Sequence, residues 1–125
     1  KVIISQTTSE HAGEPSKDGK YKLLATVEVL KPEEICTFSY ITLGLFETIG
    51  CANNLKSYLL TKFARFLLLQ TISSIHISKD NFQFVPMQDF SESWTDEKLY
   101  KKYDLDEKEI AFIEAMIRPM GRDNE

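Results

Sequence analysis

Residues 53–75 read NNLKSYLLTKFARFLLLQTISSI, and their apolar side chains recur at the three- and four-residue intervals of a helix. The asparagine pair at the start has the residue type that caps a helix N-terminus. A membrane span is excluded, because the longest unbroken apolar run is residues 66–69 and Lys62 and Arg65 interrupt the centre. A helix that is apolar around its circumference must be covered on two sides. We therefore expect one long central helix between a β-sheet and a second helical layer.

Three segments before this helix have the residue types of β-strands. Val2–Gln6 is a short apolar run, and Tyr21–Leu30 alternates with the period of two that indicates one buried face. Pro32 lies in the break that follows, and Ile35–Phe46 resumes the β-forming pattern. After the helix, Asn81–Pro86 alternates and stops at a proline, as is typical of an edge strand. The pattern predicts a small antiparallel sheet in meander order.

The tail from Ser91 onward predicts a helical hairpin. Thr95 precedes two acidic residues, which favours the start of a short helix. Asp106, with Glu109 three residues later, has the capping-box pattern that begins a second helix. The predicted fold is therefore α+β, with a small antiparallel β-sheet (meander) packed on a long central helix and a C-terminal helical hairpin. We expect one compact domain, in which residues 1–90 form the core and residues 91–125 the hairpin.

Charge is unevenly distributed along the chain. The 125 residues include 15 Lys plus Arg and 19 Asp plus Glu, which gives a net charge of −4. Residues 1–88 carry nine basic and eight acidic groups, a balance of +1, whereas residues 89–125 carry six and eleven, a balance of −5. The net charge therefore hides a locally neutral or basic face in the first two thirds of the chain, and the acidity belongs to the hairpin.

Little in the sequence suits an enzyme. His11 and His76 are far apart, and Cys36 and Cys51 lack the spacing of a zinc site, so two free thiols in a reducing cytoplasm are the simplest interpretation. Gly-rich phosphate loops and the GxSxG nucleophile motif are missing. Pairs of carboxylates occur at turns and caps, where solvent exposure explains them. We therefore expect a chain that is not itself an enzyme and holds no metal or cofactor.

Two groups of residues suit contact with nucleic acid. The polar loop at residues 7–22 offers basic and hydroxyl side chains that can donate hydrogen bonds to base edges or phosphates. Lys62 and Arg65, three residues apart, share one side of the helix and could line a phosphate backbone. The alternatives are a mobile hairpin tip for the loop and a solvated face for the helix. The candidate DNA-binding residues are Ser9, His11, Lys17, Lys20, Lys22, Lys62, Arg65 and Lys79.

The hairpin is a poorer candidate for reading DNA. Its two short helices resemble a helix–turn–helix in length, but the second helix begins with Asp106, Glu107 and Glu109. These carboxylates would face phosphates of the same sign. A solvated acidic face with the apolar stripe packed inward is the better interpretation.

Several segments of the chain, taken in order, resemble a known protein family. They are Lys1–Ser5, His11–Gly13, Val29–Leu30, Glu34–Thr37, Leu59–Leu67, Phe82–Phe90, Trp94–Tyr100 and Ile110–Glu114. Together they resemble the C-terminal region of adenine-N6 DNA methyltransferases from bacterial restriction–modification systems, over nearly the whole chain. In that family this region is the target recognition domain. A separate N-terminal domain binds S-adenosylmethionine and methylates the flipped adenine.

The resemblance implies a chain that selects a DNA sequence without catalysing methylation, because the family's Asn-Pro-Pro-Tyr or Asp-Pro-Pro-Tyr tetrapeptide is missing. The chain begins at Lys1, and we expect it to be a fragment of a longer cytoplasmic methyltransferase, with or without a fused endonuclease. Its expected partners are double-stranded DNA and the methyltransferase domain of that parent, and not a membrane. The alternative is a protein-interaction module whose acidic hairpin docks a partner subunit of the restriction–modification complex.

Overall fold

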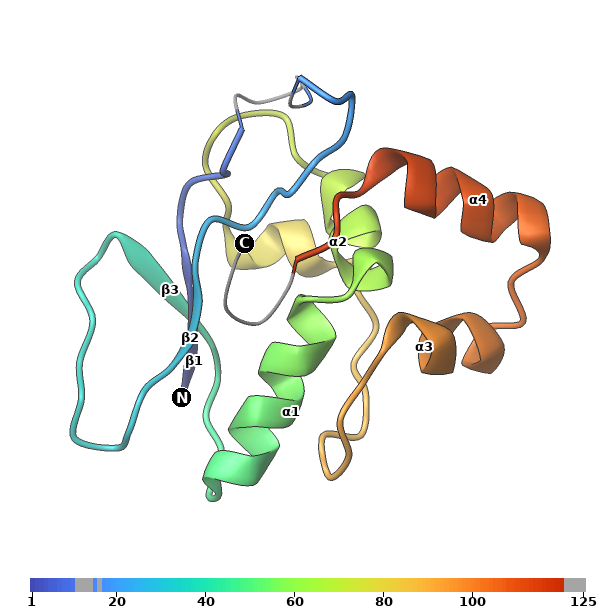
Figure 1. Cartoon of the computed structure of the whole chain (residues 1–125). Coiled ribbons are helices and arrows are strands. Elements are labelled where there is room, and N and C mark those ends of the chain that lie inside the picture. Colours follow the sequence, from blue (N-terminus) through green and yellow to red (C-terminus); the bar gives the residue numbers. More distant parts are fainter. Residues whose placement is uncertain (11–14, 16, 121–125) are drawn as a thin grey trace.

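The computed structural model describes residues 1–10, 15 and 17–120, and within them a three-stranded sheet lies beside four α-helices (Figure 1). The strands are β1 (Val2–Ser5), β2 (Val27–Val29) and β3 (Tyr40–Gly44). Both outer strands pair antiparallel with β1, so the order is β2-β1-β3. The α+β class and the small antiparallel sheet are confirmed, whereas the meander order is wrong. The most apolar strand takes the centre, where all three residues Val2 to Ile4 are buried.

The strands are shorter than the sequence pattern suggests. Of the expected strand Tyr21–Leu30, only β2 pairs regularly with β1. Leu23 has a φ of +70°, which a regular strand does not allow, and Leu24 forms only an isolated bridge with Thr8. Leu23 and Leu24 are nevertheless buried at 2% and 1% exposure. This part of the chain therefore anchors the preceding loop to the core and does not extend the sheet.

The helical stretch at residues 53–75 is divided into two helices. The first, α1 (Ile49–Leu59), begins after Thr48, whose hydroxyl accepts a backbone N–H of the first turn at 3.2 Å. The second, α2 (Lys62–Leu69), begins after Thr61, whose hydroxyl accepts an N–H of that turn at 3.1 Å. The expected long central helix and its asparagine cap are therefore wrong. A threonine at each start provides the cap, and the second one interrupts the helix.

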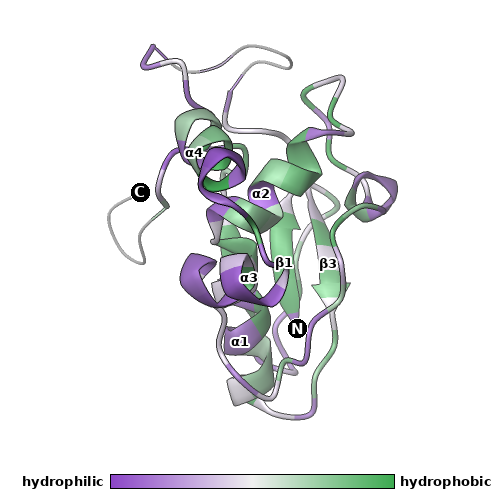
Figure 2. Cartoon of the chain, turned by 90° about the vertical axis from the view of Figure 1, so that its right-hand side faces the viewer, coloured by the Kyte–Doolittle hydropathy of each residue, from purple (hydrophilic) through white to green (hydrophobic). Residues whose placement is uncertain are grey.

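The two helices face different layers. α1 contacts β1 and β2, while α2 contacts the hairpin formed by α3 (Asp96–Lys102) and α4 (Glu107–Met116). Figure 1 shows the helices on one side of the sheet, and Figure 2 shows hydrophobic residues along α2 and β1 with hydrophilic ones on α3. Leu99 of α3 and Ile113 of α4 belong to the same buried cluster as Val2 of β1. A single core therefore runs from the sheet to the hairpin.

The hairpin follows its sequence signals. The Thr95 hydroxyl accepts the Lys98 N–H at the start of α3. At the start of α4, the N–H of Glu109 donates to the Asp106 carboxylate at 2.8 Å, and the N–H of Asp106 donates to the Glu109 carboxylate at 3.0 Å. Both predicted caps and the helical hairpin are confirmed.

The expected edge strand at Asn81–Pro86 is wrong. The chain forms a 3₁₀-helix there, η1 (Lys79–Phe82). The side-chain oxygen of Asn81 accepts the Ser78 N–H at 2.8 Å, and its amide donates to the Thr71 carbonyl at 3.0 Å. Such local side-chain bonds compete with strand pairing. Among the described residues, no helix has the length and apolar character needed to cross a membrane.

Candidate nucleic-acid interface

The loop that follows β1 is closed at its base. The N–H of Thr8 donates to the carbonyl of Ile75 at 2.8 Å, which ties the outgoing strand to a distant segment. The Glu10 carboxylate accepts the N–H of Lys22 at 3.1 Å and the N–H of Leu23 at 2.9 Å. Hydrogen bonds to an ionised acceptor are stronger than neutral ones. The two ends of the loop, at residues 10 and 22, are therefore held together.

The returning side of the loop is attached to the end of α4. The N–H of Tyr21 donates to the Met116 carbonyl at 2.8 Å, and the Tyr21 carbonyl accepts the Arg118 N–H at 2.8 Å. Asp18 and Arg118 form an ion pair with 3.4 Å between Oδ2 and Nη2. Gly19 has a φ of +77°, which permits the turn between Asp18 and Tyr21. Arg118 thus lies beside residues that are far from it in the sequence.

We call residues 17–22 together with Arg118 the basic arm. It carries four cations, Lys17, Lys20, Lys22 and Arg118, and one carboxylate, Asp18, so its balance is +4 − 1 = +3. Lys17 is exposed, and the other two lysines are half-buried. The structure therefore brings three of the predicted loop cations together and adds an arginine that sequence reasoning missed.

The other predicted loop residues have different surroundings. Ser9 is exposed, and its hydroxyl donates to the Glu10 carboxylate that closes the loop. His11 lies outside the described residues. Lys79 is exposed as the first residue of η1, on a different segment from the basic arm.

Lys62 points toward α4. Its Nζ lies 2.9 Å from Glu114 Oε2, and its side chain is 19% exposed. The Tyr100 hydroxyl donates to the same carboxylate oxygen at 2.9 Å. Burial acts to raise the pKa of Glu114, but hydrogen bonds from Lys62 and Tyr100 and the charges of Lys62 and Lys20 outweigh it and lower that pKa. Lys62 and Lys20, predicted from separate parts of the sequence, therefore interact with one carboxylate.

Arg65 does not share an exposed side with Lys62. It is 1% exposed, and its guanidinium donates to the carbonyls of Leu60 at 2.9 Å, Lys22 at 3.0 Å and Thr61 at 3.2 Å. Two of these carbonyls lie where α1 ends and α2 begins, and a guanidinium has enough donors to satisfy all three. Its expected place on an exposed face is wrong: Arg65 joins the helix junction to the stem of the loop.

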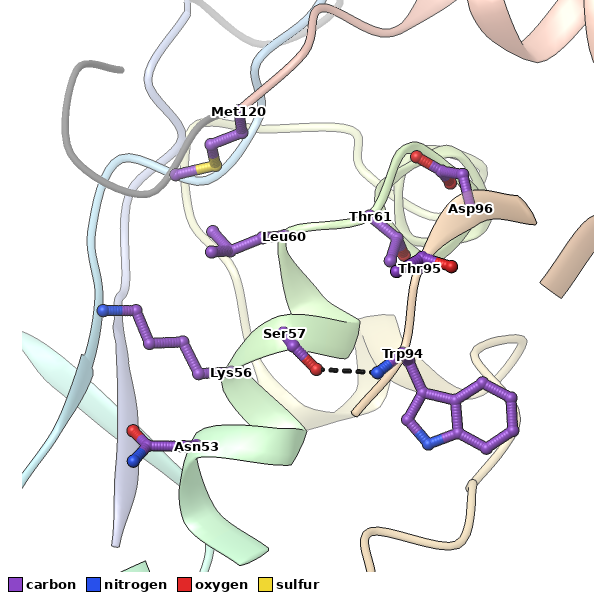
Figure 3. A pocket seen from close by; sticks show the side chains of 9 residues that line it. All are labelled: Asn53, Lys56, Ser57, Leu60, Thr61, Trp94, Thr95, Asp96 and Met120. Carbon is purple, nitrogen blue, oxygen red and sulfur yellow. Dashed lines mark hydrogen bonds between the residues drawn. The ribbon is translucent and has the colours of Figure 1, made fainter. Parts of the chain in front are cut away.

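A separate hollow of about 440 Å³ lies beside α1 (Figure 3). Its lining residues are Asn53, Lys56, Ser57, Leu60, Thr61, Trp94, Thr95, Asp96 and Met120. Several of its polar groups bond within the fold: the backbone N–H of Trp94 donates to the Ser57 hydroxyl at 2.9 Å, and the Asp96 carboxylate accepts two N–H groups of α2. Across the described residues, no cluster of His, Cys, Asp and Glu suits a metal ion. Ser57 and Asp96 of the hollow are therefore engaged in contacts within the fold.

Comparison with known proteins adds no family. No protein-family model matches the chain, and neither does any curated protein or solved structure. What the chain does must therefore be inferred from the basic arm and its surroundings. The local sequence could not indicate that Arg118 and Glu114 belong to this site, because their partners Asp18 and Lys62 lie far away in the sequence.

Proposed function

We propose that the chain is the DNA-sequence-recognition module of a restriction–modification adenine-N6 methyltransferase. On this proposal it has no catalytic role of its own, and it positions duplex DNA for a separate domain that binds S-adenosylmethionine and transfers the methyl group. The choice of family depends on the sequence resemblance. The basic arm is the observation that carries the DNA-binding part, because it brings cations from two distant segments of the chain together.

The arm is held in place before any ligand binds. Glu10 and the backbone pairing of Tyr21 with the end of α4 hold its C-terminal end, and the Asp18–Arg118 ion pair lies nearer its other end. A segment that is already ordered loses less conformational entropy on binding. Exposed Lys17 can reach a phosphate directly, and the half-buried Lys20 and Lys22 can extend their ammonium groups along the surface. These cations would set the register on the duplex, and loop side chains would read base edges.

Acidic neighbours restrain binding to phosphate alone. The Lys20 N–H donates to the Asp18 carboxylate at 3.0 Å, and this bond, with the charge of Arg118, lowers the pKa of Asp18. Asp18 is therefore ionised at neutral pH, and a phosphate must compete with it for Arg118. Competition of this kind weakens binding to any duplex and leaves base contacts with a larger share of the affinity. A recognition module benefits from that balance.

The salt dependence of DNA binding tests the proposal. Fluorescence anisotropy would follow the chain on a labelled duplex between roughly 50 and 200 mM salt. Each lost phosphate contact reduces the slope of log K against log salt by about 0.9, so Lys17→Ala with Lys20→Ala should flatten it by about 1.8. The matched control is Lys101→Ala with Lys108→Ala, two exposed hairpin lysines, which should leave the slope unchanged. Equal slopes for the unaltered chain and the basic-arm variant would contradict the proposal.

A further inference from the structure

An apolar groove of about 440 Å³ lies between α2 and α4, away from the basic arm. Its walls are aromatic and aliphatic side chains of the two helices and of the turn before α4. Lys108 and Glu109 stand at its edge. The apolar lining residues are Phe63, Phe66, Leu67, Leu105, Phe112 and Ile113. A soluble fold normally covers such a surface or uses it for binding.

The aromatic residues of the groove are already fixed in position. Phe66 and Phe112 meet edge to face, with ring centroids 5.7 Å apart and 86° between the rings. Phe63 stacks on Tyr103, with centroids 5.0 Å apart. Phe112 is nevertheless 58% exposed. The groove therefore presents a preformed apolar surface, and its burial against a partner would lower the free energy.

An acidic rim, residues 104–109, borders one end of the groove. It reads DLDEKE and carries four carboxylates and one lysine, a balance of −4 + 1 = −3. All four acidic residues are exposed. The capping box holds Asp106 and Glu109 at the N-terminal end of α4, so two of the charges have fixed positions. The rim therefore favours a partner with positive charge beside its apolar contacts.

We propose that this groove binds a basic amphipathic helix of a partner protein. α4 has ten residues and is about 15 Å long, which accommodates apolar anchors at positions i, i+3, i+4 and i+7, a span of about 10 Å. The apolar face of such a helix lies against Phe66 and Phe112, and its lysines or arginines meet the acidic rim.

Charge argues against two other occupants. A DNA backbone would place phosphates against carboxylates of the same sign. A second copy of this chain, docked through the same surface on both copies, would bring its own acidic rim to the interface. A basic helix meets neither repulsion. The proposal is independent of DNA binding, since the basic arm joins α4 at its other end.

Binding of two synthetic peptides tests the proposal. The first is an 18-residue peptide with leucine at helical spacing and lysine elsewhere, and the second has glutamate in place of each lysine. Isothermal titration of the chain should show binding of the lysine peptide and at least tenfold weaker binding of the glutamate peptide. Phe112→Ser should weaken the lysine peptide about tenfold, which corresponds to about 1.4 kcal/mol. Phe84→Ser is the matched control, because Phe84 is also 58% exposed but lies outside the groove, and it should have no effect.

Charge reversal at the rim supplies a second comparison. Glu107→Lys should weaken the lysine peptide and strengthen the glutamate peptide, whereas Glu97→Lys, at an exposed position on α3, should change neither. Equal binding of both peptides, or equal effects of Phe112→Ser and Phe84→Ser, would overturn the proposal. So would sedimentation showing a dimer that Phe112→Ser dissociates, because the groove would then hold a second copy. The basic-arm variants should bind the lysine peptide normally, which separates failure here from failure of the DNA-binding proposal.

Discussion

Arg65→Met should strongly destabilise the fold. The guanidinium of Arg65 donates to three backbone carbonyls, at 2.9, 3.0 and 3.2 Å, and the residue is 1% exposed. Methionine keeps much of the apolar volume but donates nothing, so the carbonyls lose these partners inside the protein. At about 1–1.5 kcal/mol for each hydrogen bond, the expected loss in the free energy of unfolding is roughly 3–4 kcal/mol. A domain typically has a free energy of unfolding of about 5–15 kcal/mol, so this loss would be a large part of the total.

Urea denaturation followed by circular dichroism measures this loss. With a slope of about 1.5–2 kcal/mol/M, the midpoint should fall by roughly 2 M. Arg118→Met is the matched control: its ion pair with Asp18 is 3.4 Å long and joins side chains that are 42% and 46% exposed. An exposed pair of this kind contributes little to stability, so this variant should leave the urea midpoint nearly unchanged. Arg65→Lys keeps the charge and some donors, so its urea midpoint should lie between those of Arg65→Met and Arg118→Met. Its stability can still be measured if the methionine variant does not fold.

The outcome distinguishes a structural arginine from a DNA-binding one. A free energy of unfolding for Arg65→Met within about 1 kcal/mol of the unaltered chain would refute the assignment, since the loss of three hydrogen bonds from a buried residue should cost more than that. A variant with unchanged stability but a much lower affinity for DNA would also refute the structural assignment.

Three further predictions concern the same packed helices. Asp96→Ala removes the acceptor for two N–H groups at the start of α2, at 2.9 and 3.1 Å. By urea denaturation, the free energy of unfolding should fall by about 1–2 kcal/mol, whereas Glu97→Gln at an exposed position should lower it by under about 0.5 kcal/mol. The folded-state pKa of Glu114 is lowered, so its ionised form stabilises the fold. This stabilisation is present above the unfolded pKa of about 4.5 and is lost as the pH falls through the folded value. In a plot of unfolding free energy against pH, Glu114→Gln should therefore flatten the decrease on the acid side. Burial raises the pKa of Tyr58 to about 12, so its contribution to stability is complete below pH 10 and lost as pH rises through 12. Burial also raises the pKa of Tyr100, so the phenolate absorbance of Tyr58→Phe should show a smaller late-titrating phase. A Glu114→Gln acid limb as steep as that of the unaltered chain, or an unchanged late phase in Tyr58→Phe, would contradict these assignments.

Local signals predicted the hairpin well. Thr95 and the Asp106–Glu109 pair act within one turn of their own helices, so the sequence alone contains both partners of each cap. The mixture of helices and antiparallel strands was also predictable, because apolar periodicity changes from two to three or four along the chain.

The division between α1 and α2 depends on a distant residue. Thr61 carries a local signal for a cap, but its neighbours continue the helical apolar pattern, which favoured one long helix. The Asp96 carboxylate, more than 30 residues away, accepts the N–H groups of Lys62 and Phe63 that an unbroken helix would use internally. Pattern reading along one segment could not include that partner. The strand order escaped prediction for a similar reason, because pairing partners are chosen by the whole core.

The candidate site was partly predictable. Lysines of the 17–22 segment were identified from their residue type and loop composition, which are local properties. Arg65 and Lys62 were placed on one helix side by their spacing, but spacing does not tell which side faces the core. Arg118 joins the site only through pairing with Tyr21. Residues that reach a site by long-range pairing are therefore the ones that sequence reasoning misses.

The most direct test of DNA binding by the basic arm is a residue-resolved footprint on the chain. Two-dimensional ¹H–¹⁵N NMR spectra of the labelled chain would be recorded with and without duplex DNA at low salt. The account predicts chemical-shift changes at residues 17–22 and 116–118 that disappear at high salt, with none at the acidic rim. Changes concentrated at residues 104–109, or spectra that DNA leaves unaltered at low salt, would contradict it.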